Sequence, residues 1–208
     1  MRLRPTNPLT ATGGNQTRMP PPKTVSFSHM EDGTKEEYLF LEQLEREYIG
    51  GLATRVLDSL KQLKDSVTGY QINRLEHSLQ SATRASRDGA SEELIVAALL
   101  HDLGDVLAPC NHGEFAASIL RPYVSEETYW IVKHHGVFQN YYYAHHLGGD
   151  RNARDRYRDH PHYDATLRFC HEWDQKAFAP DYDSLPLDTF EPMVRRIFAR
   201  KAFEHEHA

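Results

Sequence analysis

The sequence contains no hydrophobic run long enough to cross a lipid bilayer. No stretch approaches the roughly 18 apolar residues that a membrane-spanning helix needs, so we expect no membrane partner. Excess positive charge is also missing: the formal net charge of −6 argues against a duplex nucleic-acid partner, which calls for a basic face. Cysteine is scarce, because only Cys110 and Cys170 occur. Two cysteines suit a reducing cytoplasm and argue against a disulfide scaffold.

The alternation of polar and apolar residues that marks a half-buried strand is absent as well. Apolar residues instead recur at three- and four-residue spacing from Glu36 onward, and Ser91 and Ser125 stand where helix N-caps are expected. The predicted helices cover 36–48, 52–63, 72–82, 94–107, 112–120, 125–138, 164–178 and 190–203, with a charged helix or ordered loop at 150–157. The sequence therefore predicts an all-α fold.

Residues 1–29 differ in composition from the rest of the chain. They hold no acidic residue and include the run Pro20-Pro21-Pro22, so we expect a disordered N-terminal tail followed by a helical domain over residues 30–208. An acid-free, arginine-containing start is also seen in organelle transit peptides, but the prolines argue against an amphipathic helix. A natural start at Met30 is the favoured alternative.

The sequence has 13 histidines, and histidine is the commonest transition-metal ligand. His101 and Asp102 directly follow the apolar run 94–100, where burial of an imidazole and a carboxylate is costly unless a partner satisfies them. A metal ion would satisfy both, and the carboxylate could bridge two ions. A helix-end pair without a metal is the alternative for these two residues taken alone.

Four further candidate ligands lie on separate predicted helices, at inward-facing or helix-end positions. They are His77, His112, His135 and Asp174. Helices that converge in this way can build a dinuclear metal site in the core of a bundle. Four histidines and two aspartates, with no thiolate, favour iron or manganese over zinc. His135 is chosen over its neighbour His134 because His135 matches a ligand of the family named next.

These residues follow the H…HD…D order of the HD superfamily, with two additional helix histidines. The segments Ile72–Gln80 and Ile95–Gly104 closely resemble the mixed-valent di-iron oxygenases that cleave organophosphonates. Members of that family act on 2-amino-1-hydroxyethylphosphonate and on its trimethylammonium analogue, and myo-inositol oxygenase is a more distant relative. The resemblance covers roughly residues 69–178 and implies an HD-domain helical bundle with a central dinuclear site.

The resemblance also implies a distribution of the ligands over two irons in the Fe(II)/Fe(III) state. One iron would be held by His77, His101 and Asp174, the other by His112 and His135, with Asp102 as the bridge. Manganese or another divalent metal is the alternative cofactor. The second ion has fewer protein ligands, so a substrate that chelates a metal would bind there, and dioxygen would be the co-substrate.

The substrate-binding positions depart from the family pattern. Gln139 stands where the relatives have lysine, His171 where they have arginine, Asp105 where they have histidine, and Tyr70 where they have a lid glutamate. Replacement cations for a phosphonate dianion could come from Lys133, Arg151 or Arg154. Tyr141, Tyr142 and Tyr143, with Phe138 and Trp173, could enclose a quaternary ammonium, although aromatic clusters of this kind are more often core packing.

Two functions are therefore compared. The first is a cytoplasmic di-iron oxygenase that uses O2 to cleave a small 1-hydroxyphosphonate or a related chelating alcohol. The second is a metal-dependent phosphohydrolase acting on a phosphoester or nucleotide, in which a metal-activated water attacks phosphorus. A binding module without catalysis is poorly supported, because six buried polar ligands are a costly way to build a scaffold.

Overall fold

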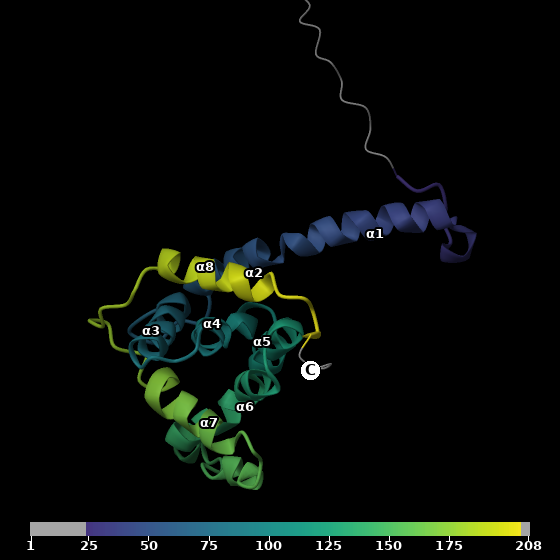
Figure 1. Cartoon of the computed structure of the whole chain (residues 1–208). Coiled ribbons are helices and arrows are strands. Elements are labelled where there is room, and N and C mark those ends of the chain that lie inside the picture. Colours follow the sequence, from purple (N-terminus) through teal and green to yellow (C-terminus); the bar gives the residue numbers. More distant parts are fainter. Residues whose placement is uncertain (1–23, 205–208) are drawn as a thin grey trace, which may run out of the picture. The chain divides into compact units, whose positions relative to one another are not determined.

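The computed structural model describes residues 24–204 (Figure 1), so the predicted tail before residue 24 lies outside the described part of the chain. Residues 24–29, the end of that tail, contact the following helix: Ser26 donates hydrogen bonds to Glu37, and Phe27 packs on Tyr38 with ring centroids 5.5 Å apart. Contacts separate the described residues into a part up to Glu45 and a part beginning at Arg46. All candidate site residues lie in the second part.

The fold is all-α, as predicted, with no strand among residues 24–204. The α-helices are α1 (Lys35–Gly50), α2 (Leu52–Gln62), α3 (Arg74–Arg87), α4 (Glu92–Leu100), α5 (His112–Leu120), α6 (Glu126–Tyr143), α7 (Tyr163–Arg168) and α8 (Leu187–Phe198). Short 3-10 helices are η1 (Met30–Asp32), η2 (Leu63–Asp65), η3 (Leu103–Val106), η4 (Arg121–Tyr123), η5 (Ala144–Leu147) and η6 (Ala153–Tyr157), and η7 (Phe169–Asp174) is a π-helix. In this described part, no helix combines the length and apolar character needed to span a membrane.

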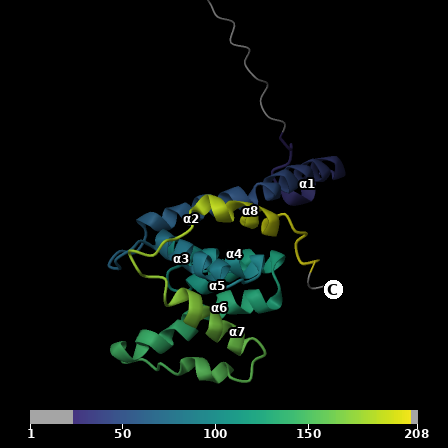
Figure 2. The same ribbon diagram turned by 60° about the vertical axis from the view of Figure 1, so that its left-hand side comes forward.

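From residue 46 onward the helices lie in three layers. Both views place α2 with α8 on one side, α3, α4 and α5 in the middle, and α6 with α7 on the other side (Figures 1 and 2). α4 is apolar all round, from Ile95 to Leu100, because it is enclosed by its neighbours. Leu57 and Leu60 of α2 and Phe190 of α8 complete the core on the outer side.

The helices that carry the candidate ligands begin at strong N-caps. Asn73 and Glu76 form a capping box at the start of α3, with both hydrogen bonds at 2.9 Å. Ser91 and Ser125 accept hydrogen bonds from Leu94 N and Thr128 N at the starts of α4 and α6, as the sequence predicted. These caps fix where each helix starts, and therefore which face turns inward.

Two predicted helices are not regular in the structure. α4 ends at Leu100 instead of continuing to Leu107, so the adjacent residues His101 and Asp102 can face the same centre, which a regular helix would separate by about 100°. The helix predicted over 164–178 is a short α7 that continues as π-helix η7, where Gln175 N bonds to Cys170 O at 3.0 Å. Wide turns of this kind are frequent at functional sites.

Candidate metal centre

Six side chains from five segments meet in the middle of the bundle. They are His77 from α3, His101 and Asp102 after α4, His112 at the start of α5, His135 from α6, and Asp174 at the end of η7. All are buried except His112, whose side chain is 28% exposed. The structure thus brings together every residue that the sequence singled out as a candidate metal ligand.

Backbone carbonyls fix the orientation of three of the four imidazoles. The Nδ1 atoms of His77, His101 and His135 lie 3.0, 2.9 and 2.6 Å from the carbonyl oxygens of Ala177, Ala98 and Val132. A carbonyl oxygen can only accept, so each Nδ1 must carry the proton that it donates. In a neutral ring the Nε2 lone pair is then left free, and it points to the centre.

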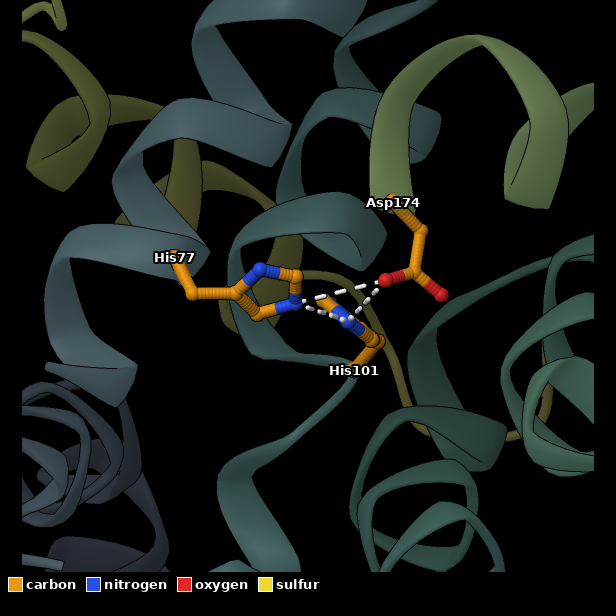
Figure 3. Close-up of side chains that lie close together, drawn as sticks. All are labelled: His77, His101 and Asp174. Carbon is orange, nitrogen blue, oxygen red and sulfur yellow. Dashed lines mark hydrogen bonds and ion pairs between the residues drawn. The ribbon is translucent and has the colours of Figure 1, made fainter. Parts of the chain in front are cut away.

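One group of donor atoms lies around the Oδ2 end of the Asp102 carboxylate. The Nε2 atoms of His77 and His101 are 3.2 Å apart, and each lies 3.3 Å from Asp102 Oδ2. Asp174 Oδ1 lies 3.3 and 3.5 Å from the same two nitrogens (Figure 3). Donors about 2.1 Å from a metal ion stand about 3.0 to 3.4 Å apart in octahedral or tetrahedral geometry, so one ion fits among these four atoms.

A second group lies around the other oxygen of the same carboxylate. The Nε2 atoms of His112 and His135 are 3.2 Å apart and lie 3.5 and 3.3 Å from Asp102 Oδ1. The Asp102 carboxylate therefore stands between two pairs of imidazole nitrogens, one pair at each oxygen. The Oδ1 end has one donor fewer than the Oδ2 end and is nearer to solvent.

Several polar atoms of the centre lack a protein donor, and this arrangement suits a bound cation. Asp174 Oδ2 is buried and has no hydrogen-bond partner, and nitrogen lone pairs face one another and two carboxylates. Burial lowers the pKa of His101, but the charges of Asp102 and Asp174 outweigh it and raise this pKa well above the usual value. Burial raises the pKa of Asp174, but the charge of His101 outweighs burial, and the net pKa lies below the usual value. Positive charge is favoured here, and the donor set suits metal ions that displace the protons.

A cavity of about 300 Å³ opens onto this centre. Its wall includes ligand candidates from both ends together with Tyr70, Arg74, Gln139, Tyr142, Tyr143, Gln175 and Phe178. The ring of Phe178 stacks on His77 with a centroid distance of 4.4 Å and on Tyr70 at 5.0 Å, so an aromatic wall covers the Oδ2 end. A neighbouring cavity of about 460 Å³ shares His112, Gly136 and Tyr143 with the first.

The predicted substrate residues are distributed unevenly around these cavities. Tyr70 and Gln139 line the cavity at the centre, and Lys133 lines the neighbouring one, where it pairs with Glu114 at 3.2 Å. Asp105 lies behind the centre, against Arg74 and His112.

The other predicted substrate cations line neither cavity. Arg151 and Arg154 lie over the ring of Tyr141, at 4.2 and 3.7 Å from its centroid, and His171 Nδ1 lies 3.1 Å from the Tyr142 hydroxyl. The expected aromatic enclosure is also different, because Tyr142 and Tyr143 line the central cavity while Phe138 and Trp173 belong to the core. His134 stacks on Trp130 at 3.7 Å and lines the neighbouring cavity.

Sequence reasoning missed Arg74 and Phe178. Arg74 Nη2 lies 2.7 Å from Asp102 Oδ2, and its side chain is only 13% exposed. Arg74 precedes His77 by three residues, a spacing that places two side chains on one helix face, so the signal was present in the sequence. Phe178 lies beyond the last predicted ligand and carries no comparable signal.

Comparison with known proteins finds one family model and one curated relative that this chain resembles. Residues 74–172 match the HD domain family, a stretch that ends just before Asp174. Over 106 residues the chain is 30% identical to a curated [1-hydroxy-2-(trimethylamino)ethyl]phosphonate dioxygenase (glycine-betaine-forming) from Leisingera caerulea. The match covers 46% of this chain and 51% of that protein, so this chain matches about half the length of its relative. The all-α fold, the similarity of residues 74–172 to the HD domain and the resemblance to a phosphonate dioxygenase are thus confirmed.

Proposed function

We propose that this HD-domain chain is a di-iron oxygenase that uses O2 to cleave a small 1-hydroxyphosphonate or a related chelating alcohol. The observation that carries the proposal is the Asp102 carboxylate, with one pair of imidazole nitrogens at each of its oxygens. The similarity of the chain to a phosphonate dioxygenase supports the reaction class. We also propose a cytoplasmic location, which agrees with two cysteines that form no disulfide.

His77, His101, Asp174 and Asp102 Oδ2 would hold one ion, and His112, His135 and Asp102 Oδ1 would hold the other. Imidazole and carboxylate donors without a thiolate suit iron, and manganese is the alternative. When bound as an Fe(II)/Fe(III) pair, the irons would supply the activation of O2. The second ion would have three donors from the protein, which leaves positions for the substrate's oxygens.

The proposed reaction balances with one O2. Conversion of a 1-hydroxyphosphonate to a carboxylate and inorganic phosphate breaks a C–H and a C–P bond, and these two bonds release four electrons, which reduce one O2. The residues of the cavity would orient the substrate for this step and exclude water. The Phe178 and Tyr70 rings cover the Oδ2 end, so the substrate would enter from the side of Gln139 and Tyr143.

The charge of the cavity decides how an anionic group would be held. Arg74 is the one lysine or arginine that lines it among the described residues, and this guanidinium is already shared by two carboxylates. The charge of a phosphonate would therefore be offset mainly by the metal ions, with Gln139 and the tyrosine hydroxyls as neutral donors. The Tyr70, Tyr143 and Phe178 rings could face a trimethylammonium group through cation–π attraction.

A phosphohydrolase remains the second candidate because of the neighbouring cavity. Its volume of about 460 Å³ and its shared wall at His112 provide room for a substrate larger than a two-carbon phosphonate. A phosphoester or nucleotide bound there could be attacked by a water that two metal ions acidify.

Oxygen consumption separates the two candidates. The iron-loaded protein would be supplied with 1-hydroxyphosphonates bearing an amino or a trimethylammonium group, in an oxygen-electrode cell with phosphate release measured in parallel. We expect one O2 consumed per phosphate released, and no consumption by the Asp102→Ala variant. Mössbauer spectra of reduced and air-exposed protein would report a coupled mixed-valent pair. Hydrolysis of phosphoesters without O2, and no oxygen uptake with any phosphonate, would overturn the oxygenase proposal.

A further inference from the structure

We infer that Arg74 and Asp105 form a positioning pair that orients His112 and the Asp102 carboxylate, and thereby sets the affinity of the second metal position. The inference rests on the two-metal centre proposed above. It concerns side chains behind the ligands and outside the set that the sequence analysis assigned to metal binding.

A single guanidinium joins the two carboxylates. Arg74 Nη2 lies 2.7 Å from Asp102 Oδ2, and Arg74 Nε donates to Asp105 Oδ2 at 2.7 Å. The side chains of Asp102 and Asp105 are 3% and 9% exposed, so both contacts are shielded from solvent. The planar fork of arginine fixes direction as well as distance, so Arg74 sets how the two carboxylates are turned relative to each other.

The other oxygen of Asp105 faces His112. Asp105 Oδ1 lies at ion-pair distance from His112 Nδ1, 3.5 Å away, and the hydrogen bond from this nitrogen to the Pro109 carbonyl is long, also 3.5 Å. The other three imidazoles of the centre have a carbonyl within 3.0 Å of Nδ1. His112 therefore lacks the short backbone bond that orients its counterparts, and the Asp105 carboxylate is the charged group beside its Nδ1. Carboxylates in this position orient a ligand imidazole and raise its basicity.

This placement replaces the substrate-binding role that the sequence analysis gave Asp105. Asp105 is absent from the wall of the central cavity, and both of its oxygens face protein groups. A substrate that coordinates the second metal would meet His112 and His135, with Asp105 behind them. Where the relatives have a histidine, this chain has Asp105, which would act on the metal through His112.

The role of Arg74 can be separated from simple electrostatics. A guanidinium beside a metal centre repels cations, so its removal would tighten metal binding if charge alone mattered. If Arg74 instead positions the Asp102 and Asp105 carboxylates, loss of its guanidinium would free both and weaken binding of the second ion. The sign of the change in Arg74→Met therefore distinguishes positioning from charge.

The test is a titration of metal-free protein with Co(II), followed by its visible absorption and by metal counting. The wild type should bind two ions per chain. Asp105→Ala should keep the first ion with unchanged affinity, and Arg74→Met should still bind it, although it loses a partner of Asp102 Oδ2. Both variants should bind the second ion about 10- to 100-fold more weakly, the usual effect of removing a group that orients a ligand. Retention of the first ion shows that the variants are folded.

Two further variants complete the test. Asp105→Asn keeps an acceptor for His112 and should weaken the second ion less than Asp105→Ala does. Asp183→Ala removes an exposed partner of Arg87 and should change neither affinity. Equal affinity for the second ion in Asp105→Ala and wild type, or tighter binding in Arg74→Met, would overturn the inference. Fewer than two ions in the wild type would instead contradict the two-metal proposal.

Discussion

The two ends of the Asp102 carboxylate are built differently. Around Oδ2, the rings of His77 and His101 are fully buried, bonded to the backbone and accompanied by Asp174. Around Oδ1, His112 is partly exposed and borders both cavities. A buried and fully oriented donor set holds an ion in place, whereas an open set leaves room for exchange and for substrate oxygens. In the proposed two-metal centre, this difference predicts that the Oδ2 end retains its ion and that the Oδ1 end coordinates the substrate.

Replacing the shared carboxylate tests this comparison most strongly. In Asp102→Ala both groups of donors lose an oxygen, so we expect the metal content to fall from two ions per chain to nearly none. His112→Ala removes a donor from one end only and should retain about one ion per chain. Metal analysis of the purified variants gives the result, and equal losses in the two would contradict the bridging role.

Gly104→Ala tests the open end without touching a ligand side chain. A Cβ at Gly104 would lie 2.6 Å from the Cα and carbonyl oxygen of His112, so the start of α5 must shift. We expect a loss of about 1 to 3 kcal/mol in the free energy of unfolding, together with weaker binding of the second ion only. Gly50→Ala, which meets nothing within 4 Å, is the control and should leave both quantities nearly unchanged. Urea denaturation and metal counts decide the result.

Glu93→Gln addresses a part of the bundle away from both ends. Glu93 accepts hydrogen bonds from Ser125 N, Ser125 Oγ and Arg200 Nη1 at 2.8, 2.6 and 2.6 Å. Burial raises the pKa of Glu93, but these hydrogen bonds outweigh it and lower the pKa from 4.5 to about 2. The variant should lose about 1 to 2 kcal/mol of unfolding free energy at pH 7 and keep both metal ions.

The same variant gives a pH dependence with a defined sign. Because the pKa is lower in the folded state, the stabilisation by Glu93 is complete above about pH 4.5 and is lost as the pH falls to about 2. The difference in unfolding free energy between wild type and Glu93→Gln should therefore shrink over this range. A difference that stays constant from pH 7 to pH 2.5 would show that the charge of Glu93 contributes nothing.

The smallest expected effect concerns the substrate side of the open end. Tyr143 lines both cavities and is 49% exposed. If its ring faces a trimethylammonium group, Tyr143→Leu should raise KM for that substrate about two- to fivefold, the size of an exposed cation–π contact. KM for an uncharged analogue of the same shape should stay unchanged. A similar increase for both substrates would indicate lost packing instead.

Much of the centre could be predicted because several ligand candidates carried their own sequence signal, while His135 was chosen over His134 by the family resemblance. His101 and Asp102 are polar residues at the end of a continuous apolar run, and His77 lies in a predicted helix that also carries Leu75 and Leu79. The structure brings all six candidates together, while their identity as metal ligands stays a prediction. Arg74 was overlooked because an arginine in the first turn of a helix is usually a solvated residue, although its spacing to His77 placed it on the same face.

The substrate side could not be predicted in the same way. Arg151 and Arg154 were selected for their charge, but charge does not give direction, and both lie over the ring of Tyr141. The three tyrosines at 141–143 do not all line one wall, since successive residues on a helix point about 100° apart: Tyr142 and Tyr143 line the central cavity and Tyr141 does not. The π-turn that carries Asp174 has no signal in composition or periodicity. It is defined by the hydrogen bond from Gln175 N to Cys170 O, five residues back, which the sequence pattern does not reveal.

The carbonyl acceptors behind His77, His101 and His135 also determine where mutation can act. The carbonyls of Ala177, Ala98 and Val132 belong to the main chain, so a substitution at these positions changes a side chain and leaves the acceptor in place. His112 alone among the four has only a long backbone bond and a side-chain carboxylate, that of Asp105, beside its Nδ1, and a substitution can remove this carboxylate. Substitutions that change the orientation of a ligand imidazole are therefore expected mainly at the open Oδ1 end, where a new substrate would bind.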